Sequence, residues 1–303
     1  MRKSLMLTIA AASLLSAASS ALAAGTWVPI NNPFGSSSVT LFGINSSDIV
    51  TGDYLDSSSL QHGFVGPFDG SNYKSFDDPD GTTQPRGISE KSWITGLDAG
   101  SAAQWERNPK GSLKAITQGG NEVVLGVVQG INKSGVFVGD YSNARGIGFA
   151  AIGKKYKYTT KIKRGYAGRA IDDAGDIGGW YYDSNGIQHG FLILNGTATR
   201  LDYPKASYTV VEGLSDKGIV TGQYQDASGV IHGFYYTIST MKFKDLTVPG
   251  SLLTQVWGIS NHGVIAASSD IGSYVYCLHA KTCPTAGGVV NKHHIPGFKP
   301  AVQ

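Results

Sequence analysis

The chain has 303 residues, of which 16% are charged and 41 are glycine. Lysine and arginine outnumber the acids by only 25 to 22, which argues against a dedicated nucleic-acid-binding protein, because such proteins carry a strong basic excess. Glycine costs about 1 kcal/mol in a helix interior, so this composition favours a turn-rich β protein over a helical one.

Residues 1–23 are predicted to be a secretory signal peptide. Arg2 and Lys3 precede an apolar run, and Ala21-Leu22-Ala23 forms a small-x-small cleavage pattern. The run is too short and too rich in alanine and serine for a membrane span, and no later segment is apolar enough for one. We therefore expect an exported protein, secreted or periplasmic, with a single domain over residues 24–303.

That domain repeats a unit of about 43 residues six times. Each unit opens with a triplet resembling Gly-Ile-Asn, and a second small residue follows nine positions after the first. The triplets begin at Gly43, Gly87, Gly130, Ala170, Gly213 and Gly258. Aromatic residues come later in the units, at Phe64, Trp105, Phe149, Phe191, Phe234 and Tyr276.

Each unit divides into four short runs with strand character. In the fifth unit they are 209–214, 219–224, 231–236 and 241–246, and turn sequences such as Ser-Asp-Lys-Gly separate them. Four antiparallel strands per period of about 43 residues are typical of a propeller blade. The sequence thus predicts an all-β fold, a six-bladed β-propeller of four-stranded antiparallel blades.

The sixth unit lacks a clear fourth strand. Residues 26–33 resemble the fourth run of the other units, so we expect them to pair with the strand at 274–278 and close the ring. The competing candidate for that edge is the tail at 289–295. Cys277 and Cys283 lie six positions apart, and in an oxidising compartment we expect them to form a disulfide.

The sequence Gly-Ile-Asn-Lys-Ser-Gly-Val-Phe-Val-Gly-Asp-Tyr at 130–141 and the His-Gly-Phe triplets at 62–64, 189–191 and 232–234 resemble the extracellular HAF-repeat proteins of bacteria. The resemblance runs from about residue 43 to 276 and implies a propeller-like fold and an exported location. It supplies no catalytic residue. This chain has glycine where the family has the middle alanine, and three units lack the histidine.

The histidines of the triplets follow an aspartate by six positions, as Asp56/His62, Asp183/His189 and Asp226/His232. They could form repeated acid–base or metal pairs. We prefer a structural clamp, in which the aspartate caps its turn and the histidine bonds a backbone group across the strand, because catalytic sites seldom recur around a ring.

The residue before each triplet varies while its neighbours barely change. These residues are Phe42, Arg86, Gln129, Arg169, Glu212 and Trp257. If the first strands line the axis, the six form a mixed ring of cations, an acid, an amide and aromatics, as a small-ligand or sugar site would use. The alternative is drift at a position that the fold leaves unconstrained.

A basic run over 154–166 contains no acid and includes Lys155, Lys157, Lys161, Lys163 and Arg164. It could bind an anionic glycan or the cell surface. The preferred alternative is a solvated outer strand whose lysines prevent edge-to-edge pairing.

Two functions remain open at this point. The first is a non-enzymatic exported binding module for a glycan, a cell-envelope component or another protein. The second is a propeller enzyme, a hydrolase or lyase acting on an extracellular polysaccharide or lactone. We expect no cofactor, no metal site and a monomer. Opposed titratable groups at the channel mouth would favour the enzyme, and aromatics with scattered polar groups would favour the binder.

Overall fold

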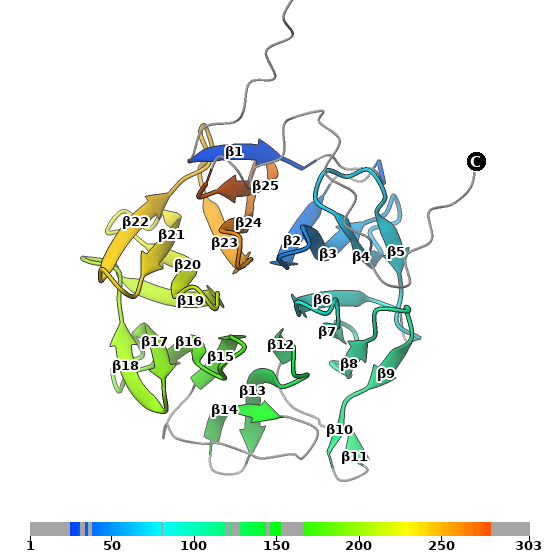
Figure 1. Ribbon diagram of the computed structural model, residues 1–303, viewed down its shortest axis with the longest axis horizontal. Coiled ribbons are helices and arrows are strands. Elements are labelled where there is room, and N and C mark those ends of the chain that lie inside the picture. The colour runs from blue at the N-terminus through cyan, green and yellow to red at the C-terminus, as the bar shows by residue number, and fades with distance from the viewer. Residues whose placement is uncertain are drawn as a thin grey trace, which may run out of the picture.

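The computed structural model describes residues 25–30, 34–35, 38–79, 81–118, 121–122, 128–143, 146–152 and 166–279. Every regular element in these ranges is a β-strand, and the strands form sheets arranged radially around a central axis (Figure 1). This is a β-propeller, as the repeat predicts. Within the described ranges, no helix could cross a membrane. The innermost strands are β2 (Val39–Ile44), β6 (Thr83–Ile88), β12 (Val128–Ile131), β15 (Tyr166–Ile171), β19 (Tyr208–Leu214) and β23 (Thr254–Ile259).

Five sheets have four antiparallel strands. Their further strands are β3 (Ile49–Leu55), β4 (Gln61–Pro67) and β5 (Lys74–Phe76); β7 (Ile94–Asp98), β8 (Gln104–Arg107) and β9 (Leu113–Ala115); β16 (Ile177–Tyr182), β17 (Gln188–Leu194) and β18 (Thr197–Leu201); β20 (Ile219–Gln225), β21 (Ile231–Thr237) and β22 (Lys242–Leu246); and β24 (Val264–Ser269), β25 (Gly272–Cys277) and β1 (Thr26–Pro29). The four runs predicted for the fifth unit match β19 to β22 within two residues at each end.

One sheet differs from this plan. β12, β13 (Phe137–Asn143) and β14 (Gly146–Ile152) form a three-stranded sheet between the sheets that begin with β6 and β15 (Figure 1). The prediction of six four-stranded blades is therefore corrected to five in the described chain. Residues 153–165, with the predicted basic patch of Lys155, Lys157, Lys161, Lys163 and Arg164, lie outside the described residues. A short hairpin of β10 (Thr117–Gln118) and β11 (Asn121–Glu122) projects beyond β9.

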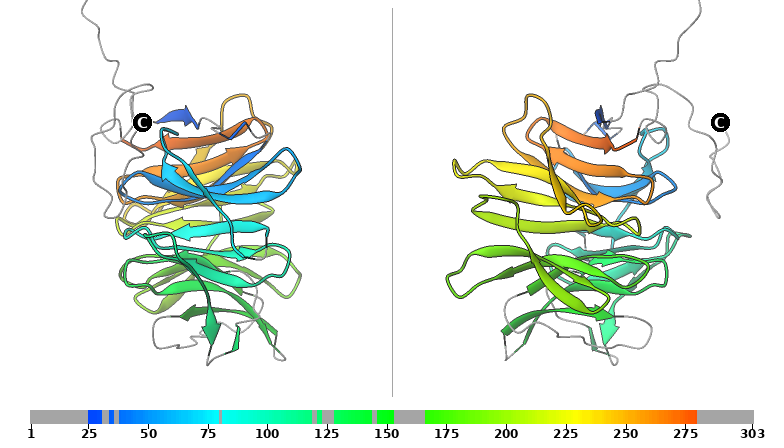
Figure 2. Two further views of the ribbon diagram at one scale, coloured as in Figure 1. Left: turned by 90° about the vertical axis from the view of Figure 1, so that its right-hand side faces the viewer. Right: turned by 60° about the vertical axis from the view of Figure 1, so that its left-hand side comes forward.

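The ring closes through the N-terminal strand, as predicted. β1 pairs antiparallel with β25, and Trp27 lies opposite Tyr276 with their ring centroids 4.9 Å apart. Figures 1 and 2 show β1 at the outer edge of the sheet that contains the last strands of the chain. One blade thus combines strands from both ends of the domain. The competing tail at 289–295 lies outside the described residues.

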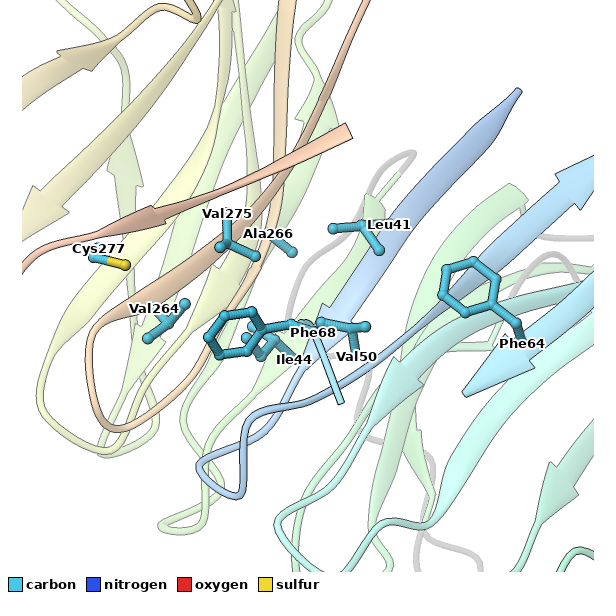
Figure 3. Packing of buried hydrophobic residues seen from close by; sticks show 9 residues of the cluster. All are labelled: Leu41, Ile44, Val50, Phe64, Phe68, Val264, Ala266, Val275 and Cys277. Carbon is cyan, nitrogen blue, oxygen red and sulfur yellow. The ribbon is translucent and has the colours of Figure 1, made fainter. Parts of the chain in front are cut away.

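The seam between this closing blade and the first blade is filled by an apolar cluster (Figure 3). Leu41, Val50 and Phe64 come from the first blade, and Val264 and Val275 come from the closing blade. All five are fully buried. Burying apolar area contributes about 25 cal/mol per Å², so these side chains stabilise the contact between the closing blade and the first blade.

Cys277 is also fully buried in this cluster. Its expected partner Cys283 lies outside the described residues, so the disulfide stays a prediction.

The two small residues that recur nine positions apart in each unit, glycine in most units, are required for different packing reasons. A Cβ at Gly87 would collide with the Gln129 carbonyl oxygen on the innermost strand of the next sheet. A Cβ at Gly222 would collide with the Val210 carbonyl oxygen and with the ring of Phe234 inside its own sheet. The first glycine therefore lets neighbouring blades approach along the axis, and the second makes room for the buried aromatic of the third strand.

Candidate functional site at the channel mouth

Each innermost strand carries a β-bulge at the same place in the repeat. The antiparallel register with the second strand shifts between Leu41 and Gly43 in the first sheet, and the same shift recurs in the other five. The residues inside the bulges are Phe42, Arg86, Gln129, Arg169, Glu212 and Trp257, the last sharing its bulge with Gly258. We call these six residues the bulge ring.

A bulge explains why this position varies. The extra residue has no partner on the neighbouring strand, and its side chain breaks the alternation of side chains between the two faces of the sheet. The ladder therefore does not restrict its identity, whereas its neighbours must pack between blades. The sequence located the six residues by their variability but gave no sign of the bulges.

Five members of the bulge ring line one cavity of about 70 Å³ on the axis; they are Phe42, Arg86, Gln129, Arg169 and Glu212. Trp257 does not line it, but packs edge-on against Phe42 with ring centroids 5.0 Å apart. The predicted channel ring is thus brought together in space, with its sixth member one layer back. Whether it binds a ligand stays a prediction.

The bulge ring has two unlike halves. Trp257 and Phe42 adjoin each other on one side, and the rest of the ring runs Arg86, Gln129, Arg169 and the acid Glu212. The guanidinium of Arg86 lies 4.6 Å from the centroid of the Phe42 ring, where a cation–π contact joins the halves. Such a mouth suits a ligand that is itself apolar on one side and anionic on the other.

Burial shifts the pKa values of the charged residues in the bulge ring. Desolvation and the nearby Arg169 lower the pKa of Arg86 to about 10, against the opposing pull of Asp53 and Glu212. Burial raises the pKa of Glu212, although both arginines act to lower it. Arg169 Nε lies 3.7 Å from Glu212 Oε2, which is an ion pair without a hydrogen bond.

Asp53 on β3 joins this group, although the sequence analysis did not single it out. Burial raises its pKa to about 6, while a hydrogen bond from Gln61 and the charge of Arg86 act in the other direction. Gln61 Nε2 donates to Asp53 Oδ2 at 2.6 Å. The available sequence signal was the position after the second glycine, which reads Asp53, Leu97, Asp140, Trp180, Gln223 and Ser268.

Hydrogen-bond donors without acceptors are concentrated here. Arg86 Nε, Arg169 Nε and Trp257 Nε1 are buried and have no hydrogen-bond partner within the described chain. Trp180 Nε1 is likewise unpaired, and its ring lies 5.9 Å from the Arg169 guanidinium. One acceptor, Gln223 Oε1, is unpaired at the position equivalent to Trp180. A buried unpaired polar group costs about 1–3 kcal/mol, so the site favours a ligand that brings acceptors.

A belt of apolar side chains divides the channel. Ile44, Ile88, Ile131, Ile171, Leu214 and Ile259 line both this cavity and a second one of about 60 Å³. The second cavity opens at the hairpin turns that follow the innermost strands, and its lining includes Glu90, Asp173 and Asp216. The molecule therefore has a bulge-ring mouth and, across the belt, an acidic mouth.

The acidic mouth is held by bonds that run from blade to blade. In five of the six turns, a backbone N–H donates to a side chain of the next blade. The pairs are Ser46 to Glu90 at 3.0 Å, Lys133 to Asp173 at 2.9 Å, Asp173 to Asp216 at 2.8 Å, Asp216 to Asn261 at 2.7 Å and Asn261 to Ser46 at 2.9 Å. We call these six residues the turn ring, and its acids are already engaged in structural bonds. No group able to hold a metal was found within the described ranges.

The histidines lie on the third strands β4, β17 and β21, outward from the innermost strands. Each Nε2 faces the predicted aspartate, His62–Asp56 at 3.4 Å, His189–Asp183 at 3.4 Å and His232–Asp226 at 3.0 Å. The other oxygen of Asp226 accepts from the backbone N–H groups of Ser228 and Val230, and so caps the turn. The expectation that the histidine bonds a backbone group was wrong, because both ring nitrogens face side chains. Nε2 faces the capping aspartate, and Nδ1 faces a residue of the segment after the fourth strand, which is Asp77, Asp202 or Thr247. The geometry is that of a clamp within one blade.

Comparisons with known proteins identify the fold and no family. No protein-family model and no curated protein matches the chain. A solved structure provisionally named a gluconolactonase superposes with a TM-score of 0.51 at 9% identity, covering 83% of this chain and 91% of that one. TolB from Acinetobacter baumannii gives 0.50 at 14% identity, covering 81% of this chain and 64% of that one. A streptogramin B lyase gives 0.47 at 13% identity, covering 84% and 88%. Identities this low show a shared propeller fold and carry no activity across.

Proposed function

We propose that this chain is a binding module whose bulge ring holds the carboxylate of an anionic ligand. The observation that carries the proposal is the excess of buried donors without acceptors, two of them on arginines that line the cavity. A carboxylate supplies several acceptor lone pairs, and the guanidinium group matches its planar geometry.

The size of the cavity supports a bound group over a wholly enclosed molecule. At about 70 Å³ it is well below the roughly 300–1,000 Å³ of pockets that enclose a small molecule. A carboxylate would enter, with Phe42 beside it in the cavity wall, and the rest of the ligand would remain outside. The aromatic half of the ring favours a ligand with an apolar face, as a sugar acid has.

Export remains part of this proposal. Its support is the charged start, apolar run and cleavage pattern of residues 1–23, together with the resemblance to extracellular HAF-repeat proteins. Six blades are likewise proposed, and their support is that the sheet of β12 to β14 supplies the third bulge of the ring.

The test is calorimetric titration of the purified protein with galacturonate and with galactose, which lacks the carboxylate. We expect galacturonate to bind and galactose to bind at least tenfold more weakly. Arg86→Gln should lower the affinity for galacturonate at least tenfold, while Lys217→Gln, on an exposed turn away from the cavity, should leave it unchanged. Equal binding of both sugars, no binding of galacturonate, or full affinity in Arg86→Gln would contradict the proposal.

A second candidate is a hydrolase or lyase acting on a polysaccharide or lactone. It is favoured by Asp53, because a carboxyl group with a pKa of about 6 beside a cation suits general acid–base catalysis near neutral pH. An assay of product release from polygalacturonate and from an aldonolactone tests it. The enzyme hypothesis requires turnover of one of these substrates and its loss in Asp53→Asn. Binding of a substrate without turnover would contradict this hypothesis.

A further inference from the structure

The fourth blade along the chain, the sheet of β15 to β18, carries two aromatic residues at positions of its second strand where no other unit has one. Trp180 and Tyr182 lie two positions apart on β16, so both point to the same face of the sheet. Their ring centroids are 5.1 Å apart with the planes at 72°. The equivalent pairs elsewhere are Asp53/Leu55, Leu97/Ala99, Asp140/Ser142, Gln223/Gln225 and Ser268/Asp270, none of them aromatic.

This pair continues the bulge ring outward. Arg169 lines the cavity, and its guanidinium lies 5.9 Å from the Trp180 ring, which in turn packs against Tyr182. Tyr182 is 46% exposed, whereas Trp180 is partly buried with its indole N–H unpaired. A cation, an unpaired donor and an exposed ring therefore follow one another from the axis along one blade.

We propose that Trp180 and Tyr182 form a saccharide platform, so that the ligand of the bulge ring is an acidic oligosaccharide. This inference rests on the proposed function. With a carboxylate held between Arg86 and Arg169, the next sugar of the chain passes over blade four. The apolar C–H face of a pyranose packs on an aromatic ring, and the hydroxyl of Tyr182 and the indole N–H of Trp180 supply polar contacts at its rim.

Charge and exposure favour this occupant over a neutral glycan or a peptide. Trp180 adjoins Arg169, which lines the cavity together with Arg86, and the unpaired atoms of Trp180 and Arg169 are donors, which oxygen-rich uronides would satisfy. An extended apolar peptide would need more than one exposed ring. Of the other described large hydrophobic side chains with high exposure, Met241 and Leu252 lie on turns of other blades, and Ile187, on the turn after Tyr182, is aliphatic and offers no ring.

The test compares galacturonate with α-1,4-linked trigalacturonate by calorimetric titration of the full protein. We expect the trimer to bind at least tenfold more tightly than the monomer. Tyr182→Ala should bring trimer affinity to within threefold of the monomer's and leave monomer affinity unchanged. Tyr182→Phe, which keeps the ring, should retain most of the gain. The matched control is Gln225→Ala, at the equivalent position of blade five, which should change neither affinity.

The outcomes separate this inference from the proposed function. If the monomer binds but the trimer gains nothing, or if Tyr182→Ala keeps the full gain, the platform is wrong and the carboxylate site stands. If neither ligand binds, the proposed function is wrong and the platform falls with it.

Discussion

At the scale of single residues, Asp53 gives the bulge ring a sensitivity to pH. Its pKa is raised to about 6 by burial, so at pH 7.5 it is ionised and competes with an anionic ligand for Arg86. At pH 5.5 it is mostly protonated, whereas a sugar carboxylate with a pKa of about 3.5 stays ionised. We expect affinity for galacturonate to rise about three- to tenfold between pH 7.5 and 5.5, measured by titration calorimetry. Asp53→Asn should flatten this dependence, and an unchanged slope would exclude Asp53 as its source.

His62 makes a second prediction at this scale, on stability. Burial acts to lower its pKa, but hydrogen bonds to Asp77 and Asp56 outweigh burial, so the folded-state pKa is raised above 6.5. A histidine whose pKa is raised by folding contributes stability that is fully present at pH below its unfolded-state pKa. This contribution is lost as the pH rises through the folded-state pKa. The melting temperature of the wild type should therefore exceed that of His62→Gln by a few degrees at pH 5.5 and by less at pH 9. The pKa of Asp56 is lowered, so its own contribution is lost only in acid, below about 3.8.

The clamp interpretation also predicts what His62→Gln leaves intact. His62 lies on the third strand, away from the axis, so galacturonate affinity should stay within threefold of the wild type. A variant that loses ligand binding while keeping its melting temperature would show that the histidine acts in the site.

At the scale of elements, β1 is the closing strand and its removal tests the ring. Deleting residues 25–34 would expose the edge of β25 and remove the Trp27 contact with Tyr276. We expect a melting temperature lower by at least 5 °C and increased self-association on a sizing column, because an unpaired edge recruits other strands. The matched control is Trp27→Phe, which keeps the strand pairing and should lose less than half of that amount. A deletion variant as stable as the wild type would show that the ring closes by other means.

How far the sequence predicts these elements depends on whether the information is local. Alternating apolar residues and the turn Ser215 to Gly218 predict β19 and β20 closely, because strand and turn preferences act within a few residues. The closing strand was predictable because one unit lacked a strand. The bulges were not predictable, since they arise from the pairing of the innermost strand with the second strand of its sheet. Asp53 was missed for the same reason: its raised pKa depends on burial beside Arg86 of another blade.

At the scale of the whole molecule, the turn ring shows how six units are fastened into one ring. Each turn donates a backbone N–H to a side-chain oxygen of the next blade, and the ring returns from Asn261 to Ser46. The junction from Glu90 to Lys133 is the exception. A lysine ammonium has three donors and no acceptor, so it cannot receive the N–H of Glu90. Lys133 instead pairs with Asp173 at 2.9 Å.

This exception predicts a stabilising substitution. Lys133→Asn would place an acceptor where every other turn has one, as Asn261 does for Asp216. The Lys133 side chain is 52% exposed, and an exposed ion pair is worth only about 0–1 kcal/mol, so little is lost with it. A new hydrogen bond contributes about 1 kcal/mol, which in a protein of this size raises the melting temperature by roughly 2–4 °C. Lys133→Met removes the same charge without adding an acceptor and should not be stabilising. If both variants melt alike, the missing acceptor is not what limits the stability of the ring at this junction.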